Sequence, residues 1–175
     1  MITIEPPRTL SDLTGAGLAK PGLARFLKKA RAAVGLEGEV QVLLADDATL
    51  KRLNRTFRGK NKATDVLSFP ASATTVFFGD PEEPELAGDL AISLETAERQ
   101  AKRFGHTLRD EVHVLLLHGV LHLAGFDHEI DSGEMAARES KLREELGLPT
   151  SLIARTTAKN GAKQATKRAR KQGSR

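Results

Sequence analysis

The segment from Leu108 to Ala124 restricts the possible folds more than any other part of the sequence. Read as a helix capped by Thr107, it carries valine and leucine on nearly every side. A helix without a polar face has no side to present to water, so other elements have to surround it. With 175 residues and 39% hydrophobic content, the chain can supply that cover within one domain. We therefore expect a fold built around a buried helix.

Shorter patterns on both sides of this segment predict the elements that cover it. Helical spacing and capping residues predict four further helices, which run from Pro21 to Gly35, from Asp46 or Asp47 to about Phe57, from a Ser93 cap to about Phe104, and from Asp131 or Ser132 to Gly147. The second of these should bury Leu50, Leu53 and Phe57. Short apolar runs predict strands at 40–45, 66–69 and 88–92, and 72–86 is typical of a long loop. Because helices and strands do not alternate regularly, we expect an α+β single domain with a small mixed β-sheet packed by helices.

The basic residues are concentrated at the C-terminal end of the chain. Residues 155–175 hold eight of the 27 lysines and arginines and no acidic residue, which leaves 19 basic and 23 acidic residues, a net charge of −4, in the rest. Such a segment buries too little apolar surface to offset the entropy of ordering it. We predict a domain at 1–152 and a disordered basic tail at 153–175, which either only aids solubility or attracts polyanions.

Cysteine is absent from the chain, so disulfides, thiolate metal ligands and thiol nucleophiles are excluded. Any bound metal ion therefore has to be held by nitrogen and oxygen atoms. The sequence contains no recognisable signal peptide and no apolar stretch of membrane-spanning length. We expect a cytoplasmic protein that does not enter a membrane.

Three of the five histidines lie in one segment, at His118, His122 and His128. The first two are four residues apart, so their rings project from one face of the helix and can reach a single ion. A continued helix would carry the third about 15 Å along the axis, at about 1.5 Å per residue. Gly125 lies between them and tolerates the left-handed conformation that ends a helix and turns the chain back. The spacing therefore predicts that the three imidazoles converge.

Two interpretations of such a cluster compete. Paired histidines on a helix are often ordinary core residues whose nitrogens have partners. Three adjacent imidazoles among leucines would lack such partners, and a metal ion supplies one. We expect one zinc ion (Zn2+) per chain, although imidazole also suits nickel, copper and iron. Three protein ligands leave a coordination position for water, whose pKa the ion lowers, so the site predicts hydrolysis.

Other ionisable residues lie close to this cluster in the sequence. Glu111 is seven residues before His118 on the same helix face, which makes it a candidate base or partner of a ligand, or an ordinary acid of the first turn. Asp127 either orients an imidazole or caps the turn. His106 and His113 fall outside the spacing pattern, and we expect both at the surface or in loops, without a role.

The histidine spacing with Gly125 also matches the long zinc motif of metzincin proteases. In that motif a glutamate follows the first histidine and takes the proton from the bound water, but Gly119 occupies this position here. The ligands are thus present without the peptidase base. A metallopeptidase is an alternative, but phosphoryl transfer fits better, because metal and cationic groups stabilise much of its dispersed negative charge.

A second cluster consists of five cations within eleven residues, namely Arg52, Arg55, Arg58, Lys60 and Lys62. They lie at a predicted helix end and in the loop before a strand, where they are candidates to bind phosphates. A charge run is often only a solvated surface. Arg58 is the best candidate to reach a phosphate, because a guanidinium can bind two oxygens and Gly59 allows close approach.

Three segments, RGKNKATDVLSFP, GDLAIS and HGVLHLAGFDH, together resemble the YbeY family of bacterial endoribonucleases. The resemblance covers about Val40 to Leu146. It implies a zincin-like fold, a metal on the three histidines and a functionally important arginine at Arg58. It also implies cleavage of single-stranded RNA in ribosomal RNA maturation, notably near the 3′ end of 16S ribosomal RNA.

The same resemblance implies a role in ribosome quality control and the small ribosomal subunit as a partner, with no DNA expected. The tail and residues 72–86 lie outside the pattern and inherit no role. Attack by water and attack by the ribose 2′-hydroxyl both remain open. The alternative from another class is a ribosome-assembly RNA-binding factor whose metal is structural.

Overall fold

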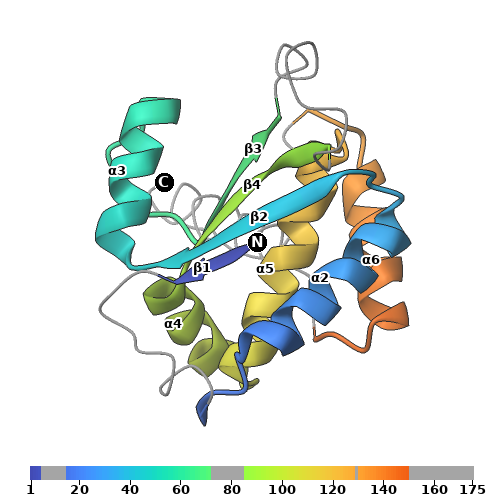
Figure 1. The fold of residues 1–175 in the computed structure, drawn as a ribbon, viewed down its shortest axis with the longest axis horizontal. Helices are drawn as coiled ribbons and strands as arrows, with labels where there is room; N and C mark the ends of the chain where they lie inside the picture. Colours follow the sequence, from blue (N-terminus) through green and yellow to red (C-terminus); the bar gives the residue numbers. More distant parts are fainter. Residues whose placement is uncertain (5–14, 72–84, 129, 150–175) are drawn as a thin grey trace, which may run out of the picture.

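The computed structural model describes residues 1–4, 15–71, 85–128 and 130–149. Four strands form one sheet in the order β1-β2-β4-β3 (Figure 1), with bounds β1 Ile2–Ile4, β2 Glu39–Ala45, β3 Val66–Pro70 and β4 Leu86–Ser93. The strand β2 pairs in parallel with β1 and β4, whereas β3 runs antiparallel to β4. The predicted small mixed sheet is therefore confirmed, and the basic tail lies outside the described residues.

The helices also agree with the sequence patterns. Their bounds are α2 Lys20–Val34, α3 Asp47–Arg58, α4 Leu94–Phe104, α5 Leu108–Leu123 and α6 Glu134–Glu145. Asp46, Ser93 and Thr107 cap α3, α4 and α5 as expected, each accepting a backbone hydrogen bond. The short strand β1 was not predicted, because three residues carry too little pattern to recognise.

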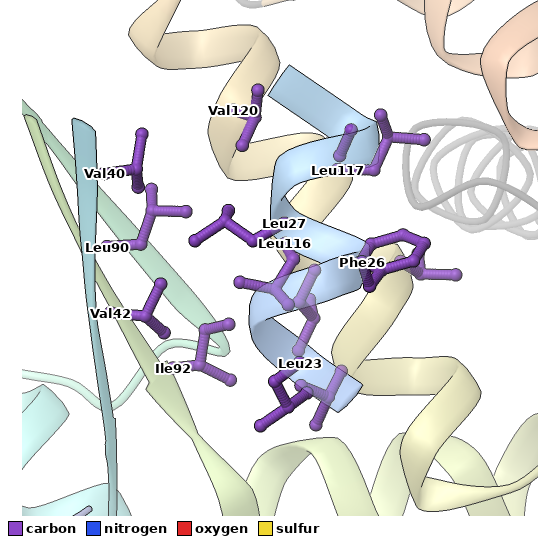
Figure 2. Packing of buried hydrophobic residues seen from close by; sticks show 14 of the residues in the cluster. Leu23, Phe26, Leu27, Val40, Val42, Leu90, Ile92, Leu116, Leu117 and Val120 are labelled. Atoms are coloured by element: carbon purple, nitrogen blue, oxygen red, sulfur yellow. The ribbon is translucent and has the colours of Figure 1, made fainter. Parts of the chain in front are cut away.

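The main core lies between one face of the sheet and the helices α2 and α5. Alternate residues of β2 and β4 point toward these helices (Figure 2), as expected for strands with one face on a core. The labelled side chains come from all four elements: Leu23, Phe26, Leu27, Val40, Val42, Leu90, Ile92, Leu116, Leu117 and Val120. Nearly every residue of α5 from Val112 to Leu123 is buried, so the prediction of a buried central helix is confirmed.

The opposite face of the sheet carries a smaller apolar cluster, formed by Ala45, Leu50, Leu67 and Ala91 under α3. Burial decreases along α3. Leu50 is 0% exposed, Leu53 is half-buried and Phe57 is 64% exposed. The prediction that Phe57 belongs to the buried stripe is therefore wrong. The last turn of α3 extends beyond the small cluster, so helical spacing alone did not guarantee burial.

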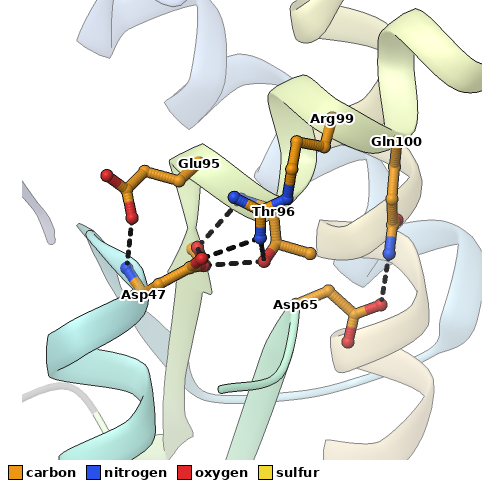
Figure 3. A network of polar contacts seen from close by, with 7 residues as sticks. Asp47, Asp65, Glu95, Thr96, Arg99 and Gln100 are labelled. Carbon is orange, nitrogen blue, oxygen red and sulfur yellow. Dashed lines mark hydrogen bonds and ion pairs between the residues drawn. The ribbon is translucent and has the colours of Figure 1, made fainter.

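A polar network ties α3 to the start of α4 (Figure 3). The Asp47 carboxylate accepts hydrogen bonds from Thr96 at 2.7 Å and from Arg99 at 2.7 Å, and also from Ser93. Burial raises the pKa of Asp47, but these hydrogen bonds outweigh it and hold the pKa below its ordinary value. Nearby, Gln100 donates to Asp65 at 3.0 Å, which fixes the chain just before β3.

None of the helices among the described residues is long and apolar enough to cross a membrane.

Candidate metal centre and adjacent pocket

The three histidines converge at the C-terminal end of α5. His118 and His122 lie one turn apart, and Gly125 follows with a φ of 89°, which is the left-handed conformation that the sequence predicted. The chain then turns back and brings His128 to the same place. One nitrogen from each ring lies within 4.8 Å of the others, and the ring centroids are 4.7 to 5.2 Å apart. The expected convergence of the three imidazoles is present.

A buried carboxylate orients the first histidine. Glu139 of α6 is 1% exposed, and its Oε1 lies 3.1 Å from Nδ1 of His118. A carboxylate in this position favours the proton on Nδ1, which leaves Nε2 of His118 with a lone pair. That Nε2 points into the cluster, 3.1 Å from Nε2 of His122. Metal-binding histidines commonly have such a carboxylate partner.

The other two rings also suit a cation. Burial, together with the positive charge that His118 and His128 would carry, lowers the pKa of His122 to about 4, despite an opposing effect from Asp127. His122 is therefore neutral near pH 7 and can donate a lone pair. Nδ1 of His128 is buried without a hydrogen-bond partner in the described part of the chain. Three imidazoles that bring one nitrogen each to the same place form a donor set that fits zinc.

Glu111 and the remaining histidines lie elsewhere. The Glu111 carboxylate is fully buried and contacts the His106 ring, whose side chain is 10% exposed. His113 is half-buried and stacks on Phe26 with a centroid distance of 3.9 Å. The expectation of a surface or loop position is confirmed for His106, which lies in the loop between α4 and α5, although its ring has a buried partner. It is wrong for His113, which lies within α5 and packs on Phe26. Glu139, rather than Glu111, lies beside His118.

The cluster opens into a pocket of about 670 Å³ between α5, the end of α3 and β3. Besides the histidines, the sequence analysis offered Arg58, Asp127 and Glu111 as site residues, and not all of them line this pocket. Arg58 and Asp127 line the pocket, whereas Glu111 does not. Further lining residues, none of which the sequence analysis predicted as a site residue, are Phe57, Thr64, Asp65, Val66, Ser68, Phe69, Pro70 and Phe126.

The remaining cations of the predicted cation cluster are exposed and do not line the pocket. The exposed side chains are those of Arg52, Arg55, Lys60 and Lys62. Asn54 is buried and donates to the carbonyl oxygen of Lys62 at 2.8 Å, which folds the loop after α3 back on the helix. Arg58 is thus the one member of the predicted cation cluster that shares the pocket with the histidines.

Comparison with known proteins identifies the group to which this arrangement belongs. The profile of the family described as Endoribonuclease YbeY matches residues 16–147. The chain belongs to the YbeY family. The resemblance inferred from the three sequence segments is therefore confirmed, and the matched region contains both the histidines and the cation cluster.

Individual YbeY relatives match most of the chain. Endoribonuclease YbeY of Koribacter versatilis is 53% identical over 153 residues, which cover 87% of this chain and 93% of the relative. The protein of the same name from Solibacter usitatus is 49% identical over 140 residues, covering 80% of this chain and 88% of the relative. A solution structure from Thermotoga maritima is 31% identical and covers 83% of this chain and 89% of its own, with a TM-score of 0.48.

Two features of this YbeY chain distinguish its site from the peptidase motif. A Cβ atom added at Gly119 would lie 2.7 Å from a methyl carbon of Leu90, because α5 packs closely on β4 here. The carbonyl oxygen of Gly119 also accepts a hydrogen bond from Ser68 at 3.4 Å. A side chain at position 119 would therefore require Leu90 to shift.

Glu139 is the site residue that the sequence analysis missed. A signal for it does exist, because Met135, Glu139 and Leu142 recur at helical spacing and all three are buried in α6. A carboxylate on the apolar stripe of a helix requires a buried partner. That partner is His118.

Proposed function

We propose that this chain is a metal-dependent endoribonuclease that cuts single-stranded RNA in ribosomal RNA maturation. The observation that carries the proposal is a pocket shared by the three converging histidines and Arg58. His118, His122 and His128 would hold one zinc ion, and Arg58 would bind the scissile phosphate. The relatives, which are named endoribonucleases, support the same activity.

The contacts of the side chains support a separate role for each of them. Bound zinc would supply Lewis acidity toward the phosphate and lower the pKa of a water molecule. Glu139 keeps the His118 proton on Nδ1, so that Nε2 stays available as a ligand. The Arg58 guanidinium can donate two hydrogen bonds to non-bridging phosphate oxygens and stabilise the charge that develops on them. Arg52 and Arg55 on α3 and Lys60 and Lys62 after it are exposed and would attract the RNA backbone.

Two nucleophiles are compatible with this arrangement, and their products differ. Attack by the ribose 2′-hydroxyl leaves a 2′,3′-cyclic phosphate, and it requires RNA. Attack by water leaves no cyclic end and does not need the hydroxyl. Analysis of the cleaved ends by mass spectrometry distinguishes the two, and an all-deoxy substrate provides the control.

The proposed substrate is ribosomal RNA near the 3′ end of 16S ribosomal RNA, with the small ribosomal subunit as partner and a contribution to ribosome quality control. These assignments follow from the family resemblance, and they would place the activity in the cytoplasm. A factor that binds ribosomal RNA around a structural metal is the second candidate. A peptidase is disfavoured, because Gly119 occupies the position of its catalytic glutamate and has no side chain to act as the base.

The test uses the purified full-length chain and a labelled single-stranded RNA, with and without a chelator and with zinc restored afterwards. The proposal expects cutting that the chelator stops and zinc restores, together with about one zinc per chain by elemental analysis. The His122→Ala variant, prepared in the same way, controls for contaminating nucleases. Zinc-loaded protein that binds RNA without cutting it would support the structural-metal factor instead.

A further inference from the structure

An exposed phenylalanine forms part of the wall of the histidine pocket. Phe57 is 64% exposed at the end of α3, yet it lines the same pocket as the three histidines. The next residue is Arg58, which also lines the pocket. Exposing so large an apolar ring has a cost in water, so a ring in this position is a candidate for contact with a ligand.

A second phenylalanine holds this ring in place. Phe69 of β3 packs against Phe57 with ring centroids 5.1 Å apart and an interplanar angle of 66°, which is an edge-to-face contact. Phe69 itself is half-buried and contacts the apolar cluster under α3. The Phe57 ring is therefore supported by the sheet, although most of its side chain stays accessible to a ligand.

We propose that Phe57, supported by Phe69, is a stacking platform for an unpaired nucleobase next to the scissile phosphate. The inference rests on the proposed function and extends it to the way the enzyme selects single strands. Every nucleobase has a π-face that stacks on an aromatic ring, so the contact needs no particular base. A base in a duplex is already paired and stacked, so only an unpaired base can reach Phe57 without disrupting a helix.

The position of Phe57 favours RNA over a protein partner. The ring also borders a shallow apolar hollow that includes Leu53 and Phe69, which a protein could cover. On its other side, however, the ring shares the pocket with Arg58 and the histidines, where a phosphate-bearing chain is expected. Adjacent residues 57 and 58 would thus hold a base and its neighbouring phosphate.

The chain contains no tryptophan and no tyrosine, so a Phe57→Trp variant carries a single fluorescent reporter. Phe104→Trp is the matched control, because Phe104 is also exposed, at 41%, but lies on α4 and does not line the pocket. The probes are a 2′-O-methyl single strand, the same strand with abasic sites, and its duplex. Anisotropy of a labelled probe measures binding independently of tryptophan, and a gel confirms that each probe stays intact.

We expect the single strand to quench the emission of the Phe57→Trp variant, whereas the abasic strand and the duplex leave it nearly unchanged. The emission of Phe104→Trp should not respond to any probe. Binding of the single strand without quenching would overturn the stacking platform while leaving the proposed function intact. Failure of every probe to bind the zinc-loaded chain would overturn both.

A second pair of variants removes the dependence on fluorescence. Phe57→Ala should weaken binding of the single strand by about tenfold and leave the abasic strand unaffected, since a lost base stack has roughly that effect. Phe57→Tyr should retain binding. Equal weakening for both strands would point to a structural role, and no weakening for either would point to a protein partner, so each result contradicts the inference.

Discussion

Near each end of α5 a buried glutamate contacts a histidine, and the histidine near the C-terminal end lines the pocket described above. Near the N-terminal end, His106 contacts Glu111, and His113 stacks on Phe26. At the C-terminal end, Glu139 contacts His118, which lies beside two further rings. A histidine–carboxylate pair is therefore no sign of a catalytic site by itself. Convergence of several lone pairs next to an accessible cavity is what distinguishes the second end.

The largest expected effect comes from removing one of the three imidazole rings that converge at the C-terminal end of α5. His122→Ala should lose bound zinc and reduce RNA cleavage to background, because two imidazoles rarely hold a catalytic zinc ion. His113→Phe, on the same helix, keeps a ring that can stack on Phe26 and should retain both zinc and activity. Elemental analysis and a cleavage assay on both variants check this. Normal zinc content in His122→Ala would contradict the ligand assignment.

Arg58→Ala should separate catalysis from metal binding. The variant should keep its zinc but lose roughly a hundredfold to a thousandfold in kcat, the range found when one donor to a developing charge is removed. Arg55→Ala is a suitable control, because Arg55 is exposed on the same helix but does not line the pocket. Steady-state kinetics of both variants test the difference. Equal losses would show that Arg58 acts only as one of several surface charges.

The two buried glutamates allow a direct comparison of the two ends. Glu139→Gln should weaken zinc affinity by about ten- to a hundredfold, since a carboxylate partner fixes the ligand ring and raises its basicity. Glu111→Gln should leave zinc affinity unchanged and lower only the free energy of unfolding. Competition with a chromophoric chelator measures the first quantity, and urea denaturation measures the second. A loss of affinity in both variants would mean that the two ends are not independent.

The smallest effect concerns acid stability. Burial lowers the pKa of His113 to about 4, with a further contribution from the charge of Arg109 and an opposing one from Asp110. Between this value and the ordinary pKa of 6.5, the unfolded chain binds more protons than the folded one, so the free energy of unfolding falls as the pH decreases. His113→Phe should show a shallower fall than the unmodified chain. Urea midpoints on both sides of this pH range provide the measurement, and identical slopes would contradict it.

The parts of the site that are local in sequence could be predicted. The spacing of His118, His122 and His128 with Gly125 fixes a helix and a turn, and that geometry alone brings the rings together. The caps at Asp46, Ser93 and Thr107 were predictable for the same reason. The last helix was placed slightly early, because Asp131 accepts the backbone N–H groups of Gly133 and Met135 but lies before the helix start.

The parts that depend on tertiary packing could not be predicted as well. Glu139 reaches His118 only because α6 packs on α5, and the helical spacing that places Glu139 on a buried face does not identify His118 as its partner. Phe57 has the spacing of a buried residue, but the small cluster under α3 ends before it. His106 and His113 have no pattern that reveals their buried partners. Burial at the edge of a layer depends on neighbours that sequence periodicity does not identify.

Glu139 links the last described helix to the centre of the molecule. An ion on His118 would strengthen the contact that also keeps α6 docked, so zinc occupancy and α6 docking are coupled equilibria. Zinc depletion would then first increase amide exchange in Glu134–Glu145, while Leu108–Leu123 stayed protected. In a zinc-starved cell, fraying at this helix would expose its apolar stripe to proteases before the rest of the domain opened.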